Sequence, residues 1–206
     1  MNEQTLIPIK IIMLGSINVG KTSLVTKYAT GKIPGKTKTT ESASYVSKLR
    51  SINGNNFEIK IWDTAGQEKF KSITKIFTKE SKIAILVYSI DNEESFNDLD
   101  GWLKLIKESN DKEVILGVAA NKSDLKSDST ISESKGREYA EKIGAEWKST
   151  SAILENGGIE EFVETLFLKY YSTIFITYNN NYLDDALSHI TLSTLNSRAK
   201  KGKCCK

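Results

Sequence analysis

The segment from Gly15 to Thr22, Gly-Ser-Ile-Asn-Val-Gly-Lys-Thr, matches the pattern G-x-x-x-x-G-K-[ST] and directly follows the apolar run 9–14. In such a phosphate loop, the glycines let backbone N–H groups close around phosphate oxygens at the positive end of the next helix. The lysine neutralises the β- and γ-phosphates, and the final hydroxyl binds Mg²⁺. The candidate nucleotide-binding residues are therefore Gly15, Ser16, Ile17, Asn18, Val19, Gly20, Lys21 and Thr22.

A second segment, Asp63-Thr64-Ala65-Gly66-Gln67, follows a run of apolar residues that ends at Trp62. Asp63 would then lie at the carboxyl end of a strand, where parallel sheets bind their ligands, and it can hold Mg²⁺ through water. Gly66 can donate its N–H to a γ-phosphate, and Gln67, which carries both a donor and an acceptor, can orient an attacking water. A helix-capping role would explain Asp63 but not the two later residues, so the segment indicates phosphoryl transfer.

The base of the nucleotide is indicated by Asn121-Lys122-Ser123-Asp124, which follows the apolar run 114–119. An aspartate carboxylate presents two acceptors, which match the N1–H and 2-amino donors of guanine. Adenine lacks both donors, and a buried polar group that stays unpaired costs about 1–3 kcal/mol. Alone, this tetrapeptide is common in loops that lead into helices. After the other two segments it favours GTP over ATP, with Asn121, Lys122 and Asp124 as base-binding residues.

The elements that must position these segments alternate between short apolar runs and amphipathic stretches. The expected strands cover residues 7–14, 45–52, 57–62, 83–88, 114–119 and 145–149, and the expected helices begin after Gly20 and cover 93–108, 132–143 and 158–171. This alternation predicts an α/β fold with helices on both faces of a parallel sheet. Asn53-Gly54 favours a tight hairpin. We therefore predict a mostly parallel six-stranded sheet with one antiparallel edge strand.

Taken in order, these motifs resemble the Ras superfamily of small GTPases and, within it, the Rab family, over residues 5–171. The resemblance implies a P-loop NTPase small G-domain that binds GTP or GDP with Mg²⁺ and hydrolyses GTP, with Gln67 as its catalytic residue. Thr40 resembles a switch threonine that binds Mg²⁺ only beside a γ-phosphate, and Thr150-Ser151-Ala152 resembles the last base-contacting motif. The implied metal ligands are Thr22, Thr40 and Asp63, and the further implied nucleotide contacts are Ser23, Thr40, Ser151 and Ala152.

The resemblance extends to surfaces that bind other proteins. Tyr45, Trp62 and Phe77 occupy the places of an aromatic triad with which Rab proteins bind effectors, and Ala43-Ser44-Tyr45 resembles endosomal Rabs. The implied partners are an exchange factor, a GTPase-activating protein, effectors, a GDP-dissociation inhibitor and a prenylation escort protein. The implied protein is a monomer that binds no nucleic acid and regulates vesicle trafficking.

Several residues depart from the family pattern. Ile17 and Asn18 stand where Ras proteins have two glycines, Ile33 stands where many relatives have an aromatic residue against the purine, and Ile153 replaces a lysine. A branched side chain beside the γ-phosphate would crowd Gln67 and slow hydrolysis. Two alternatives therefore remain: a scaffold that stays mostly GTP-bound and recruits effectors, and a P-loop kinase or ATPase, against which Asn121 and Asp124 argue.

The end of the chain differs in composition from the rest. The chain has 206 residues and a formal charge of +3, and five basic residues between 198 and 206 leave a charge of −2 on residues 1–197. Beyond about residue 171, Thr, Ser and Asn dominate, a composition that buries too little apolar surface to offset its ordering entropy. We therefore expect a G-domain over residues 1–171 and a hypervariable, flexible tail over residues 172–206.

The only two cysteines, Cys204 and Cys205, are adjacent. They leave no plausible structural disulfide, and the start of the chain gives no sign of a secretory signal, so we expect a cytosolic protein. The pair resembles a Rab double-cysteine prenylation site, and two lipid chains next to basic residues anchor a protein stably to a membrane. The expected location is the cytoplasmic face of intracellular membranes, with endosomes indicated, in exchange with the cytosol.

Overall fold

The structure is a computed structural model that describes residues 6–35, 40, 43–64 and 71–174. The chain divides into two units, residues 1–167 and 168–206. The first unit holds the sheet. In the second, residues 168–174 are described and are helical.

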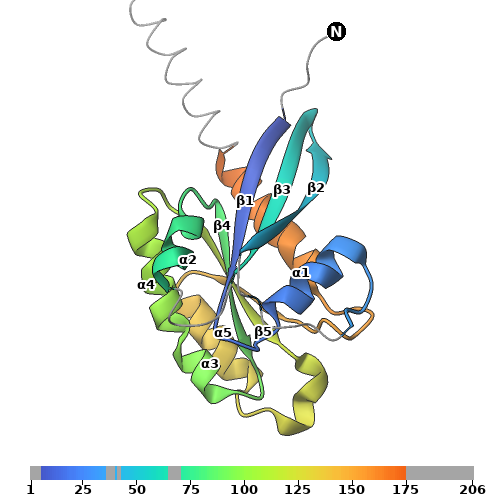
Figure 1. The fold of residues 1–206 in the computed structure, drawn as a ribbon, viewed down its shortest axis with the longest axis vertical. Helices are drawn as coiled ribbons and strands as arrows, with labels where there is room; N and C mark the ends of the chain where they lie inside the picture. Colours follow the sequence, from blue (N-terminus) through green and yellow to red (C-terminus); the bar gives the residue numbers. More distant parts are fainter. Residues whose placement is uncertain (1–5, 36–39, 41–42, 65–70, 175–206) are drawn as a thin grey trace, which may run out of the picture. The chain divides into compact units, whose positions relative to one another are not determined.

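Six strands of the first unit form one sheet in the order β2-β3-β1-β4-β5-β6 (Figure 1). Parallel pairing joins β3 to β1, β1 to β4, β4 to β5 and β5 to β6, whereas β2 pairs antiparallel with β3. The predicted mostly parallel sheet with one antiparallel edge strand is confirmed. The strands are β1 Leu6–Leu14, β2 Ser44–Ile52, β3 Asn55–Asp63, β4 Ile83–Ser89, β5 Ile115–Asn121 and β6 Glu146–Ser149.

Helices cover both faces of this sheet, as expected. Figure 1 shows α2, α3, α4 and α5 on one side and α1 on the other. A further helix packs on β5 so closely that a Cβ on Gly117 would lie 2.8 Å from Phe162 and 2.7 Å from Leu166. The helices are α1 Lys21–Thr30, α2 Lys71–Thr78, α3 Glu93–Asn97, α4 Leu99–Ser109, α5 Glu133–Lys142 and the helix over residues 159–174, with a 3₁₀ helix, η2, at Ser123–Asp128.

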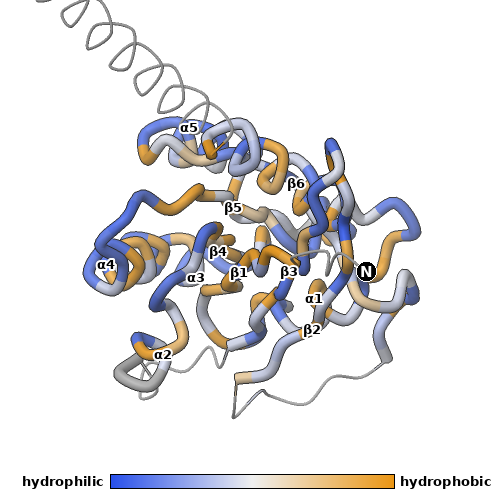
Figure 2. The backbone as a smooth tube through the Cα atoms, turned by 90° about the horizontal axis from the view of Figure 1, so that it is seen from above, coloured by the Kyte–Doolittle hydropathy of each residue, from blue (hydrophilic) through white to orange (hydrophobic). Residues whose placement is uncertain are grey.

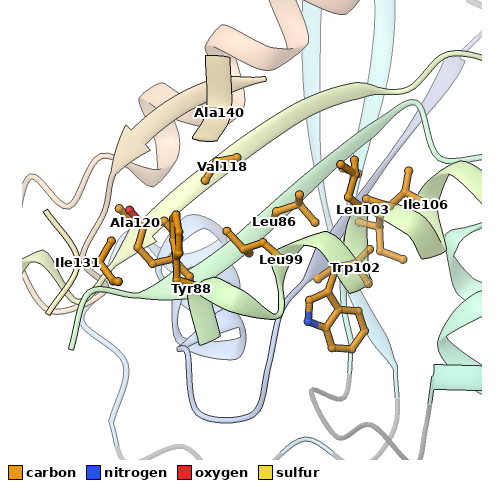
Figure 3. Close-up of a cluster of buried hydrophobic side chains, with 14 of the residues drawn as sticks. Leu86, Tyr88, Leu99, Trp102, Leu103, Ile106, Val118, Ala120, Ile131 and Ala140 are labelled. Atoms are coloured by element: carbon orange, nitrogen blue, oxygen red, sulfur yellow. The ribbon is translucent and has the colours of Figure 1, made fainter. Parts of the chain in front are cut away.

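The core lies between the central strands and the helices, where the hydrophobic stretches of β1, β3 and β4 run through the middle of the fold (Figure 2). Every residue of β4 is buried. On one face, Trp102 and Ile106 of α4 belong to the same buried cluster as Leu86 of β4 (Figure 3). Each large apolar side chain buried in this way contributes about 1.5–3 kcal/mol, so the strand ends that carry the candidate site are fixed by a well-packed sheet.

Two local features differ from the sequence prediction. The single helix expected over residues 93–108 is two helices, α3 and α4, which meet at Asp98. The backbone N–H of Gly101 donates to the carbonyl of Asp98 at 3.0 Å, a tighter turn than that of an α-helix. The short elements α2 and η2 were not predicted. Among the described residues, no helix has both the length and the apolarity that a membrane crossing requires.

Candidate functional site

A cavity of about 310 Å³ opens at the carboxyl ends of the parallel strands. This edge is where the chain leaves the sheet for its ligand-binding loops in folds of this type. Its walls come from segments that are far apart in the sequence: the phosphate loop with the start of α1, the loop before β2, the end of β3, the loop after β5 and the loop after β6. The lining residues are Ile17, Asn18, Gly20, Lys21, Thr22, Ser23, Thr40, Thr64, Asn121, Lys122, Asp124, Ala152 and Ile153.

The two glycines of the phosphate loop are required by close backbone contacts. Gly15 has a φ of 150°, and a Cβ at this position would lie 2.1 Å from the carbonyl oxygen of Val87. Gly20, at the N-cap of α1, has a φ of 94°, and its Cβ would lie 2.4 Å from Nδ2 of Asn121. Other residues would therefore be strained at both positions, and the loop is held in the curved shape that exposes N–H groups to a bound anion.

Lys21 begins α1 directly under this loop. Its Nζ donates to the carbonyl oxygens of Gly15 at 2.8 Å and Ser16 at 2.9 Å, and the residue is only 6% exposed. Burial lowers the pKa of Lys21 to about 8, although the nearby Asp63 carboxylate acts in the opposite direction. The lysine is thus a buried cation held by neutral carbonyls, which phosphate oxygens would stabilise further.

Three oxygen-bearing side chains meet beside Lys21. Oγ1 of Thr22 lies 2.6 Å from Oγ1 of Thr40, and the Thr40 hydroxyl donates to Oδ2 of Asp63 over 3.5 Å. Asp63 is 2% exposed, and its Oδ1 has no hydrogen-bond partner among the residues that the structure describes. Burial is the main cause that raises the pKa of this carboxyl group. These hard oxygen donors fit Mg²⁺, which typically takes one or two carboxylates and completes its shell with phosphate oxygens and water.

The predicted base-binding residues are joined by bonds among themselves. Nδ2 of Asn121 donates to the carbonyl of Val19 at 2.7 Å, and the Thr150 hydroxyl donates to Oδ1 of Asn121 at 3.2 Å. The Ser151 hydroxyl donates to Oδ1 of Asp124 at 2.5 Å. Asn121 therefore connects this end of the cavity to the phosphate loop, and Ser151 orients the carboxylate that is predicted to recognise guanine.

Lys122 has a partner that the motif does not predict. Its Nζ lies 3.4 Å from Oδ2 of Asp91, which follows β4 and also accepts a hydrogen bond from the Ser89 hydroxyl. Burial by itself would raise the pKa of Asp91, but these two partners outweigh it and lower the pKa. Asp91 belongs to the polar residues after a buried strand, and that position is the sequence signal by which it could have been found.

Some predicted residues lie elsewhere than in the cavity wall. Ser16 is outside it and bonds to Asp98 instead, and Ser151 supports Asp124 without lining the cavity itself. Gly15, Val19 and Asp63 do not line the cavity either, but each accepts a hydrogen bond from a lining residue. Gly66, Gln67, Cys204 and Cys205 lie outside the described residues. Conversely, Thr64 and Ile153 line the cavity although the sequence did not single them out as binding residues.

The aromatic residues expected to bind other proteins form one continuous group on β2, β3 and α2. The ring centroids of Tyr45 and Trp62 are 4.9 Å apart, and those of Trp62 and Phe77 are 5.7 Å apart. Tyr45 is 51% exposed, and Lys10 places its ammonium 5.1 Å from the Trp62 ring. The structure therefore brings the three aromatic residues together, with one of them open to solvent.

Comparisons with known proteins agree with this geometry. The pattern of the Ras family matches residues 10–172. Ras-related protein Rab-21 of Geodia cydonium is 39% identical over 162 residues, 79% of this chain and 71% of that protein. Ras-related protein Rab-21 of Homo sapiens is 41% identical over 152 residues, 74% of this chain and 67% of that protein. Ras-related protein RabJ of Dictyostelium discoideum is 33% identical over 173 residues, 84% of this chain and 66% of that protein.

The family match includes the phosphate loop, the segment after β3 and the two base-binding segments. All three relatives are Ras-related Rab proteins, and their matches span 74–84% of this chain. The chain therefore belongs to the Ras family and, within it, to the Rab small GTPases, which bind GTP or GDP with Mg²⁺, hydrolyse GTP and regulate vesicle trafficking.

Proposed function

We propose that the cavity holds one guanine nucleotide, with its phosphates at the Lys21 end and its base at the Asp124 end. The observation that carries this proposal is that Lys21 and Thr22 line the same cavity as Asn121 and Asp124. In the bound state, the loop residues 15–20 supply backbone N–H groups to the phosphates, Lys21 supplies charge, and Thr22, Thr40 and Asp63 hold Mg²⁺. Mg²⁺ would supply charge neutralisation on the phosphates.

Guanine selection follows from Asp124. Ser151 donates to one oxygen of this carboxylate, which leaves acceptor lone pairs for the two donors of guanine. Ala152 and Lys122 line the walls beside it. A competition assay tests this role: unlabelled GTP should displace fluorescent GDP at far lower concentration than ATP. Equal displacement by ATP would contradict the assignment and favour a P-loop kinase or ATPase.

Switching follows from Thr40, Gly66 and Gln67. A γ-phosphate with Mg²⁺ would draw in Thr40 and Gly66 and order the two switch segments, residues 33–45 and 64–78, and hydrolysis would release them. Gln67 orients the attacking water. Neither switch segment contains an arginine, so we propose slow intrinsic hydrolysis and an activating protein that donates one, which is typically worth about 10³–10⁵ in rate.

Single-turnover hydrolysis by the wild type and by Gln67→Leu tests this mechanism. The variant should bind GTP with unchanged affinity and hydrolyse it at least about tenfold more slowly. Equal rates would contradict the role given to Gln67. The scaffold alternative depends on Ile17, which lines the cavity and is 37% exposed. If Ile17 limits turnover, Ile17→Gly should hydrolyse faster than the wild type.

The surface roles belong to the same proposal. Exchange factors, activating proteins and effectors are the general partners of Rab proteins, and the Tyr45, Trp62 and Phe77 group is the proposed docking surface for effectors. Ile76 is the exposed neighbour of Phe77 on α2 and is not part of the triad. Ile76→Ser therefore serves as the control for Phe77→Ala. Loss of effector binding in Phe77→Ala alone would support the surface.

We further propose that the G-domain runs to residue 171 and that residues 172–206 form a tail anchored by geranylgeranyl groups on Cys204 and Cys205. Five basic residues near them would strengthen binding to an anionic leaflet by about 1 kcal/mol each. The proposed site of action is the cytoplasmic face of endosomal membranes. A GDP-dissociation inhibitor and an escort protein would handle the lipidated monomer.

Membrane pelleting of the prenylated chain tests this anchor. Replacement of both cysteines by serine should leave the protein in the supernatant, and replacement of the five basic residues by glutamine should weaken pelleting only on anionic vesicles. Persistent pelleting of the double serine variant would contradict the anchor.

A further inference from the structure

Ser16 of the phosphate loop is bonded to a residue outside the nucleotide cavity. Its hydroxyl donates to Oδ2 of Asp98 at 2.6 Å, across 82 residues of sequence. Ser16 is 7% exposed, and Asp98 is half-buried. A hydroxyl that donates to a carboxylate at this distance makes one of the stronger hydrogen bonds available to uncharged side chains.

Asp98 makes this bond in place of a more local one. It occupies the N-cap of α4 but makes no side-chain capping bond there, although aspartate is among the best N-cap residues and such a cap is typically worth about 1 kcal/mol. By contrast, Asn92 caps α3 and Ser132 caps α5 through their side chains. The Asp98 carboxylate is therefore directed to the phosphate loop and not to its own helix.

The backbone of Asp98 is firmly placed. Its N–H donates to the carbonyl of Glu94, and its own carbonyl accepts from Gly101 and Trp102. Leu99 and Trp102, which follow it on α4, are 0% and 2% exposed and belong to the buried cluster. Asp98 is thus an anchor on a rigid part of the fold.

The residue that this anchor holds also supports the buried lysine. The carbonyl oxygens of Gly15 and Ser16 each accept a hydrogen bond from the Lys21 ammonium. The next residue, Ile17, lines the cavity. A loop segment that lost its bond to Asp98 would let both the lysine acceptors and Ile17 move.

We infer that Asp98 is a positioning residue for nucleotide retention, which holds the phosphate loop in its binding shape through the hydroxyl of Ser16. This inference rests on the proposed nucleotide site. The junction of α3 and α4 belongs to none of the nucleotide-binding motifs. By this inference it nevertheless influences the rate at which the nucleotide dissociates.

Dissociation of fluorescent GDP from the full chain tests the inference. Ser16→Ala and Asp98→Ala should each raise the dissociation rate roughly tenfold, and the double variant should be no faster than the faster single variant, because both changes remove the same bond. Asp98→Asn keeps an acceptor oxygen for the hydroxyl and should stay within about threefold of the wild type.

The matched control is Asp100→Ala. Asp100 lies two residues further along on α4 and accepts a hydrogen bond from the Tyr139 hydroxyl, so its loss should leave the dissociation rate unchanged. Three results would overturn the inference. The dissociation rate of the double variant could be raised by the product of the two single effects, both single variants could stay within twofold of the wild-type rate, or Asp100→Ala could raise the rate as much as Asp98→Ala. Failure of the wild-type chain to bind GDP would instead overturn the proposed function.

Discussion

At the base end of the cavity the polar side chains are held by bonds within the protein, whereas at the phosphate end a buried ammonium is held by neutral carbonyls and one carboxylate oxygen has no partner among the described residues. Asn121 bonds to Val19 and Thr150, and Asp124 bonds to Ser151. At the other end, the Lys21 ammonium bonds to neutral carbonyls. Oδ1 of Asp63 is buried without a partner among the described residues.

This difference fits the part of the nucleotide that we propose for each end. A planar base is selected by hydrogen-bond acceptors at fixed positions. Bonds within the folded protein already hold these acceptors in place, so binding the base costs little further ordering of side chains. Phosphates and Mg²⁺ carry full charges, which interact strongly with buried charges that are not already neutralised. We therefore expect changes at the phosphate end to alter ligand affinity more than protein stability, and changes that break the bonds of the base end to lower stability as well.

The largest effect is expected from Lys21→Met. Removal of one partner from a buried charge pair typically costs about 3–5 kcal/mol, so GDP affinity should fall about 10²–10⁴-fold. The nucleotide-free variant should be no less stable than the wild type at pH 7, because a desolvated ammonium has been removed. Fluorescent GDP titration and denaturant unfolding measure the two effects. Lys27→Met, at another buried lysine of α1, should retain affinity, and a loss of stability in Lys21→Met would contradict the comparison.

The pH dependence of stability is the next effect in size. The folded pKa of Lys21 is about 8 and the ordinary value is 10.5, so between these values the unfolded chain binds more protons than the folded one. The free energy of unfolding of the nucleotide-free protein should therefore rise as pH increases from 8 to 10.5, by up to about 3 kcal/mol. The pKa of Lys10 is also lowered by burial, so the rise is measured as the difference between the wild type and Lys21→Met. Identical slopes in both proteins would refute the assignment.

Asp124→Asn tests the base end directly. The amide presents donors to the N1–H or 2-amino group of guanine, and each unpaired buried group costs about 1–3 kcal/mol. The preference for GTP over ATP should fall about 10²-fold in competition with fluorescent GDP, while phosphate contacts persist. Asp111→Asn, at an exposed carboxylate, should keep the full preference. A variant of Asp124 that still rejects ATP would show that another group reads the base.

The smallest effect distinguishes the two ends most sharply. Thr150→Val keeps the shape of a fully buried side chain but removes its hydrogen bond to Asn121, so the nucleotide-free protein should lose about 1 kcal/mol of stability. Denaturant unfolding measures it, and Thr165→Val serves as control because Thr165 lies on the exposed side of a helix. If Thr150→Val unfolds with the same free energy as the wild type, the hydrogen bonds within the base end do not stabilise the protein.

The three motifs were placed correctly from the sequence because each follows an apolar strand. Parallel strands end at the same edge of a sheet, so Lys21, Asp63 and Asn121 were expected to be neighbours, and the cavity includes or borders all three. The partners of these residues were not predictable in the same way. Asp91 follows a buried strand, which marks the edge of the sheet but not the bond to Lys122, and Asp98 lies at the junction of two helices where the sequence predicts one.

The sequence by itself determined the fold class, the family and the candidate residues of the nucleotide site, because hydrophobic periodicity and the backbone demands of glycine are local properties of the chain. Tertiary structure alone decided how these residues are bonded to one another and which atom, Oδ1 of Asp63, has no partner among the described residues. Ser16 shows the reason. Its place in the phosphate loop is readable from the motif, but its bond to Asp98 exists only because packing brings α4 against the loop.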